Sequence, residues 1–110
     1  MQAAFQVMLL LLARGQPGSQ PIEQVFTKSQ ILCLRALNQK YQGKTRKQQN
    51  PYPSNRLAWA TWIIARLGGW KGMKKARPPG PITLIRGAKR FATIFEGWII
   101  AHFEIDVLEP

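Results

Sequence analysis

The fold is decided by residues 57–70, which read LAWATWIIARLGGW. Apolar side chains occupy nearly every face of a helix drawn through this stretch, and a helix that is apolar all round is buried in a core. Ser54 or Asn55 can supply its N-cap, and the Gly-Gly pair stops it because glycine tolerates a positive φ. We therefore predict a central helix that ends at about Leu67.

Two further helices are predicted upstream of this central one. Residues 2–14 are almost all good helix formers and nearly all apolar, and the glycines and proline at 15–18 then stop the helix. A helix so uniformly apolar must be covered on most sides by other protein. The second upstream helix is predicted over residues 28–41, with Thr27 as its N-cap and apolar residues at helical spacing.

A longer helix is predicted downstream, over residues 84–102, with Thr83 as its N-cap. It carries an apolar seam with a seven-residue repeat. The seam consists of Leu84, Ala88, Phe91, Ile94, Phe95, Trp98 and Ala101. The opposite side carries Arg86, Lys89, Arg90 and Thr93. The seam can close the chain's own core or pair with a helix of a second copy, and the sequence leaves both interpretations open.

The segments between the helices are predicted to be exposed basic loops, at residues 42–53 and 71–81. The second of these combines four basic residues with a Pro-Pro-Gly-Pro run that resists regular structure. Residues 102–110 turn acidic and are predicted to be a weakly ordered tail. We predict that residues 1–110 form one domain, an all-α small bundle of about four helices, in which residues 1–14 hold the leading apolar helix.

Charge points to the class of partner. Sixteen Lys and Arg stand against five Asp and Glu, a formal net charge of +11. No acidic residue lies from Gln24 to Phe95, whereas thirteen basic residues lie from Lys40 to Arg90. Such a stretch attracts phosphate backbones and releases their counterions. Nucleic acid is preferred over anionic lipid, because the charge runs alternate with aromatic segments and no spanning helix accompanies them.

No complete active site is predicted in this chain. Three of the five acidic residues crowd the C-terminal tail, so a preorganised site for a divalent cation is not expected. For Cys33 and His102 we prefer a core thiol and a helix-end imidazole over a nucleophile and its base. Trp70, beside Lys71, is the tryptophan considered for stacking on a base, because the other three lie in helical apolar patterns.

One family resemblance covers nearly the whole chain, from residue 1 to about 101. It is carried by the run at 57–70, by RPPGPITL at 77–84, by RGAKRF at 86–91 and by EGW at 96–98. These residues resemble the C-terminal, dimerisation domain of bacterial cut-and-paste insertion-sequence transposases of the IS-four and Tn-five type. The core of the match is 22–101, and the apolar first twelve residues resemble the helix that precedes that domain.

The resemblance implies an enzyme whose ribonuclease-H-like core, with an Asp, Asp, Glu triad and a divalent metal such as Mg²⁺, would lie upstream of Met1. We therefore expect a truncated transposase that is not an enzyme by itself and holds no cofactor. Its expected partners are DNA at transposon ends and a second copy or an intact transposase, with no membrane and no small-molecule substrate. The expected location is the cytoplasm, in association with the nucleoid.

The resemblance also assigns roles to residues of this chain. The residues expected to contact DNA are Lys71, Lys74, Lys75, Arg77, Arg86, Lys89 and Arg90. The residues expected to pair protomers are Leu84, Phe91, Phe95 and Trp98. Three alternatives stay open: an independent small nucleic-acid-binding protein, a cationic protein that coats membranes, and an inert remnant of an inactivated gene.

Overall fold

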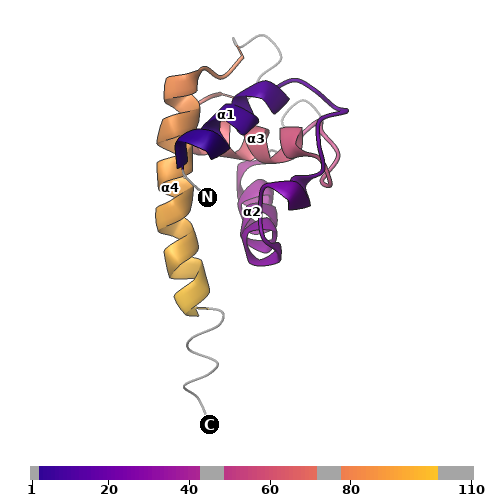
Figure 1. Cartoon of the computed structure of the whole chain (residues 1–110). Coiled ribbons are helices and arrows are strands. Elements are labelled where there is room, and N and C mark those ends of the chain that lie inside the picture. Colours follow the sequence, from indigo (N-terminus) through magenta and orange to yellow (C-terminus); the bar gives the residue numbers. More distant parts are fainter. Residues whose placement is uncertain (1–2, 43–48, 72–77, 102–110) are drawn as a thin grey trace.

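A computed structural model describes residues 3–42, 49–71 and 78–101, and these residues form an all-α bundle (Figure 1). Its elements are α1 (Ala3–Ala13), the short 3-10 helix η1 (Ile22–Gln24), α2 (Lys28–Tyr41), α3 (Leu57–Leu67) and α4 (Pro81–Ile99). The described part contains no strand, and its one β-bridge joins Pro21 to Arg56. The predicted fold class is confirmed. The tail at 102–110 lies outside the described residues.

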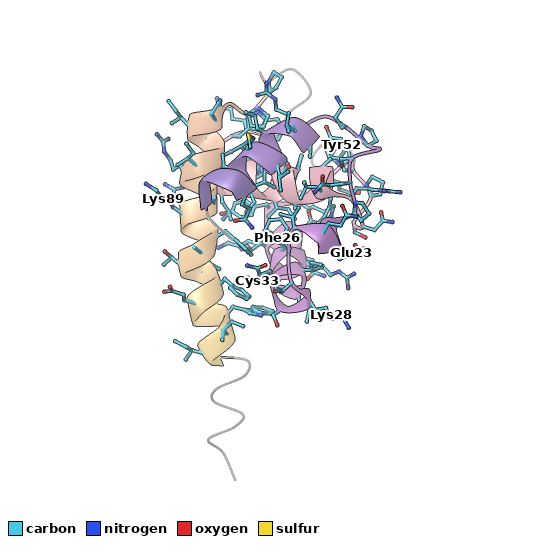
Figure 2. All side chains as sticks on the ribbon, viewed as in Figure 1. Glu23, Phe26, Lys28, Cys33, Tyr52 and Lys89 are labelled. Atoms are coloured by element: carbon cyan, nitrogen blue, oxygen red, sulfur yellow. The ribbon has the colours of Figure 1, made fainter. Side chains whose placement is uncertain are left out.

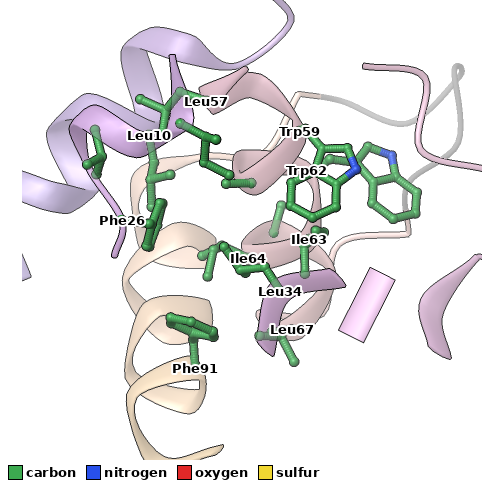
Figure 3. Close-up of a cluster of buried hydrophobic side chains, with 14 of the residues drawn as sticks. Leu10, Phe26, Leu34, Leu57, Trp59, Trp62, Ile63, Ile64, Leu67 and Phe91 are labelled. Atoms are coloured by element: carbon green, nitrogen blue, oxygen red, sulfur yellow. The ribbon is translucent and has the colours of Figure 1, made fainter. Parts of the chain in front are cut away.

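The centre of the bundle is α3, as its apolar sequence predicts. Every residue of α3 except Arg66 is buried, and the helix packs against α1, α2 and α4. Figure 3 shows Leu10, Leu34 and Phe91, each from a different helix, gathered around α3. Burial of so much apolar surface is the main favourable contribution to folding.

The start of α3 differs from the prediction. The helix begins at Leu57, and neither Ser54 nor Asn55 caps it. Its first amides are satisfied from a distant segment instead. The Leu57 amide donates to the carbonyl oxygen of Gln20 at 2.9 Å, and the Ala58 amide donates to Oγ of Ser19 at 3.0 Å. A serine oxygen thus performs the capping function, but it comes from the chain that precedes η1.

The predicted cap of α2 is confirmed. Oγ1 of Thr27 accepts a hydrogen bond from the Gln30 amide at 3.2 Å, and Oε1 of Gln30 accepts one from the Thr27 amide at 2.9 Å. This reciprocal pair is a capping box, which satisfies two amides that the first turn leaves without helical partners. The helix ends at Tyr41.

The bounds of α4 also differ from the prediction. The helix begins at Pro81 rather than after Thr83, with Gly80 at the N-cap. Proline suits the first helical position, because its fixed φ is helical and the amide it lacks would have no helical partner there. The helix ends at Ile99, with Ile100 at the C-cap, and residue 102 lies outside the described residues.

Two glycines set how closely α3 and α4 approach. A Cβ on Gly87 would fall on the carbonyl oxygen of Ile64, and one on Gly68 would fall on the carbonyl oxygen of Thr83. The two backbones therefore touch without side chains between them, and only glycine fits at either point. This contact brings the buried face of α4 against the end of α3.

The first helix is covered on most of its sides by the described residues. Val7, Leu10 and Ala13 are buried, and the carbonyl oxygen of Leu10 accepts a hydrogen bond from Oγ1 of Thr61 at 3.0 Å. Met8 and Leu12 are 51% and 71% exposed. Leu9 and Leu11 are partly buried against the core as well. The expectation that protein covers this helix on most sides is therefore met, except at Met8 and Leu12.

Parts of the predicted loops are held firmly by the helices. Nδ2 of Asn50 donates to Oδ1 of Asn38 at 3.2 Å and to the carbonyl oxygen of Trp59 at 3.1 Å, so Asn50 links α2 to α3. Pro79 is buried, and its carbonyl oxygen accepts a hydrogen bond from Arg14. Asn50 and Pro79 are therefore exceptions to the prediction that 42–53 and 71–81 are exposed loops.

Candidate nucleic-acid interface

The basic side chains fall into two groups, and the first consists of arginines that hold the backbone. Each donates from Nη1 to a main-chain carbonyl oxygen far along the sequence. The pairs are Arg14 with Pro79 at 2.6 Å, Arg56 with Ser19 at 3.3 Å, and Arg90 with Leu67 at 2.6 Å. Hydrogen bonds from a charged donor are stronger than neutral ones, so these arginines help to fix the connections between helices.

The second group consists of exposed side chains, and it includes three of the residues expected to contact DNA. Lys71 lies just after the turn that ends α3, while Arg86 and Lys89 lie on the exposed side of α4. Figure 2 shows Lys89 on the side of α4 that faces away from the other helices. Arg90 is also exposed, although one of its nitrogens holds Leu67. The remaining expected residues, Lys74, Lys75 and Arg77, lie outside the described residues.

Helix α2 carries three exposed basic residues that were not among those expected to contact DNA. They are Lys28, Arg35 and Lys40. Their signal was present in the sequence, because the lack of acidic residues from Gln24 to Phe95 includes α2. Within the described part, the acidic residues are Glu23 and Glu96. The exposed cations between them therefore have no nearby acidic residue in sequence to neutralise them.

The tryptophans serve mainly the core. Trp59 and Trp62 are each 4% exposed, so neither offers a ring face to a base. Trp70 is half-buried, packs against the core, and donates its amide proton to the carbonyl oxygen of Ala65 at 3.0 Å. Trp98 is also half-buried against the core.

The apolar seam of α4 turns inward. Leu84 and Phe91 are 0% and 4% exposed, and the Phe91 ring meets Phe26 edge-on with centroids 6.0 Å apart. They close the chain's own core, which is one of the two uses left open for the seam, and their expected part in pairing stays a prediction. Phe95 and Trp98 are half-buried beside them. Ile94 and Ala101 are exposed, so the inward face is narrower than the predicted seam.

The site offers little chemistry beyond charge. Across the three described ranges, no three His, Cys, Asp or Glu side chains come together in a group that could hold a metal ion. Cys33 is buried, and desolvation raises the pKa of its thiol, so the unreactive protonated form dominates at neutral pH. His102, its suggested partner in sequence, lies outside the described residues.

The length of the helices and the similarity of the chain to known proteins leave its functional class open. Among the described helices, none combines the length and the apolar character needed to cross a bilayer. No protein-family model, curated protein or solved structure matches the chain. The function is therefore indicated by the positive charge, the exposed basic side chains and the sequence resemblance at residues 57–98.

Proposed function

We propose that this chain binds the phosphate backbone of duplex DNA, as the C-terminal part of a bacterial cut-and-paste transposase without a catalytic core of its own. The observation that carries the proposal is the division of α4 into two faces. Leu84 and Phe91 anchor one face in the core, while Arg86 and Lys89 extend from the other into solvent. Packing thus fixes the helix that presents the charge.

The chemistry of this face fits phosphate better than bases. Arg and Lys donate to phosphate oxygens at any sequence, and each contact releases condensed counterions. The described residues present no exposed tryptophan beside these cations for stacking on a base. We therefore propose that the contacts position the chain on DNA and read little sequence.

The transposase assignment is supported by the sequence resemblance at residues 57–70 and 77–98. On this proposal the DNA consists of transposon ends, and Lys74, Lys75 and Arg77 add to the contacts made by Lys71. The divalent metal of the family would act in the catalytic core, which this chain lacks. The proposed location is the cytoplasm, on the nucleoid.

Pairing with a second copy or with intact transposase is the other part of the proposal. Leu84 and Phe91 are occupied in the core, so pairing would have to use the remaining residues of the assignment, Phe95 and Trp98, which keep part of their surface accessible. Sedimentation velocity of the purified chain over a range of concentrations tests this part. A monomer at all concentrations would contradict it.

The DNA-binding part is tested by affinity for a duplex, measured by fluorescence anisotropy at several salt concentrations. Replacing Arg86 and Lys89 together by glutamine should reduce the slope of log affinity against log salt by about 2, because each phosphate contact contributes roughly 0.9. The matched control replaces Lys28 and Arg35 of α2, which removes the same charge from another helix. No binding by the unmodified chain, or equal slopes for both double variants, would refute the proposal.

A further inference from the structure

Two basic parts of the chain that are distant in sequence meet at one arginine. Arg66 lies in the last turn of α3. Its Cζ is 5.6 Å from the centroid of the Tyr41 ring, at the end of α2. Its Nη1 donates to the carbonyl oxygens of Trp70, at 3.1 Å, and Lys71. One guanidinium therefore contacts both the end of α2 and the turn that follows α3.

The position of this guanidinium is fixed by several contacts at once. Its Cζ is also 5.8 Å from the centroid of the Trp62 ring, one turn back along α3. A cation above an aromatic face is attracted by the ring's quadrupole, and two carbonyl oxygens hold its Nη1. A lysine would reproduce this arrangement poorly, because its ammonium lies one bond nearer to the backbone than Nη1 and has no planar face to lie over two rings.

Each of the two segments that Arg66 contacts carries an exposed lysine. Lys40 directly precedes Tyr41 in the last turn of α2, and the carbonyl oxygen of Lys71 is one of the two that Arg66 holds. Both side chains are exposed. The segments that build this edge, α2, α3 and residues 68–71, contain no acidic residue. The three positive charges therefore add, rather than being neutralised within the edge.

We propose that Arg66 is a positioning residue that joins Lys40 and Lys71 into one phosphate-contacting edge. The proposal rests on the DNA binding proposed above and adds a second surface to it, built from elements other than α4. Lys40 and Lys71 make the contacts with phosphate oxygens. Arg66 keeps the two lysines close enough for one duplex to touch both.

The test measures the salt dependence of duplex binding by the full chain. Lys40→Gln and Lys71→Gln should each reduce the slope of log affinity against log salt by about 1, and each should weaken binding at 0.1 M salt by roughly threefold to tenfold. Lys28→Gln is the matched control, because it removes the same charge from the opposite end of α2. It should leave the slope unchanged.

The role of Arg66 is tested with Arg66→Lys, which keeps the charge and loses the reach and the planar face of the guanidinium. The salt slope should fall by about 1 although the net charge is the same, because Lys71 is no longer held beside Lys40. Arg56→Lys is the matched control, since Arg56 also donates to one backbone carbonyl but lies at the other end of α3. A merely structural role would lower the melting temperature of the Arg66 variant and leave the slope of the folded protein unchanged.

The outcomes separate this inference from the function it rests on. If the unmodified chain binds no duplex, the proposed function and the inference both fail. If it binds with a slope that Lys40→Gln and Lys71→Gln leave unchanged, the inference is overturned together with the contact proposed for Lys71, while DNA binding by α4 stands. Should Arg66→Lys fail to fold, the two lysine variants still decide whether the edge contacts phosphate.

Discussion

The helices α3 and α4 are both rich in apolar residues, but they use them differently. In α3 every residue except Arg66 is buried, whereas the longer α4 buries only Leu84, Gly87 and Phe91. Both helices pack against the other three, but α3 runs through the centre of the bundle whereas α4 lies along one side of it (Figure 1). Substitutions should therefore destabilise α3 almost anywhere, and α4 only at its few contact points.

The largest expected effect is at Phe91, the aromatic contact point of α4. Phe91→Ala should lower the free energy of unfolding by about 3–5 kcal/mol, the usual cost of removing a buried phenylalanine. Its ring contacts Phe26 at 6.0 Å and Phe95 at 5.9 Å between centroids. Phe95→Ala, at a half-buried position, should lose roughly half as much. Urea denaturation measures both, and equal losses would contradict the contrast between buried and half-buried positions of α4.

The next largest effect is expected at the glycine contact between the two helices. Gly87→Ala should destabilise the chain by about 2–3 kcal/mol, because the new methyl group meets the Ile64 carbonyl and the backbones must separate. Gly97 lies on the same helix, where a Cβ would meet nothing within 4 Å. Gly97→Ala should instead raise stability by up to about 1 kcal/mol, through helix propensity. Thermal unfolding measures both variants. If Gly87→Ala leaves the melting temperature unchanged, α4 is not held at this contact.

A smaller effect is expected at Thr61 in α3, which is the buried polar side chain of the described core. Thr61→Val removes the hydrogen bond to the Leu10 carbonyl and leaves that oxygen buried, which should cost about 1–2 kcal/mol. Thr93→Val makes the same change on the exposed side of α4 and should shift stability by less than about 0.5 kcal/mol. Urea denaturation measures both variants. Equal losses of stability would contradict the contrast between the buried α3 and the exposed side of α4.

The smallest effect is expected at an exposed apolar residue of α4. Ile82 is 71% exposed, so Ile82→Ser should change the free energy of unfolding by no more than about 0.5 kcal/mol. Ile64→Ser in α3, where the side chain is 1% exposed, should cost several-fold more. If Ile82→Ser proved as damaging as Ile64→Ser, the outer side of α4 would have to be covered in solution, and the contrast would need revision.

Local signals predicted most of the fold. The apolar run at 57–67 identified the central helix, and Thr27 identified the start of α2, because burial and capping depend on residues close in sequence. The cap of α3 could not be found this way, since Ser19 reaches it only after the chain folds. The start of α4 could have been found, because proline at a first helical position was visible at Pro81.

The candidate interface was less predictable than the fold. The exposed positions of Arg86 and Lys89 follow from the helical period of α4, which places them opposite Leu84 and Phe91. Other contacts depend on carbonyl and ring positions that only the tertiary structure defines. They are the hydrogen bond from Arg90 to the Leu67 carbonyl and the contacts of Arg66 with Tyr41 and Lys71. A sequence identifies an arginine as a cation, but it does not say whether backbone or solvent receives its hydrogen bonds.

The distant cap of α3 bears on the order of folding. The amides of Leu57 and Ala58 have no helical acceptor, and the partners that they find belong to Gln20 and Ser19. Closing that loop costs chain entropy before the contact returns any stability, so the first turn of α3 gains its cap only once the loop has closed. We therefore expect α3 and the segment before η1 to become ordered in the same kinetic step.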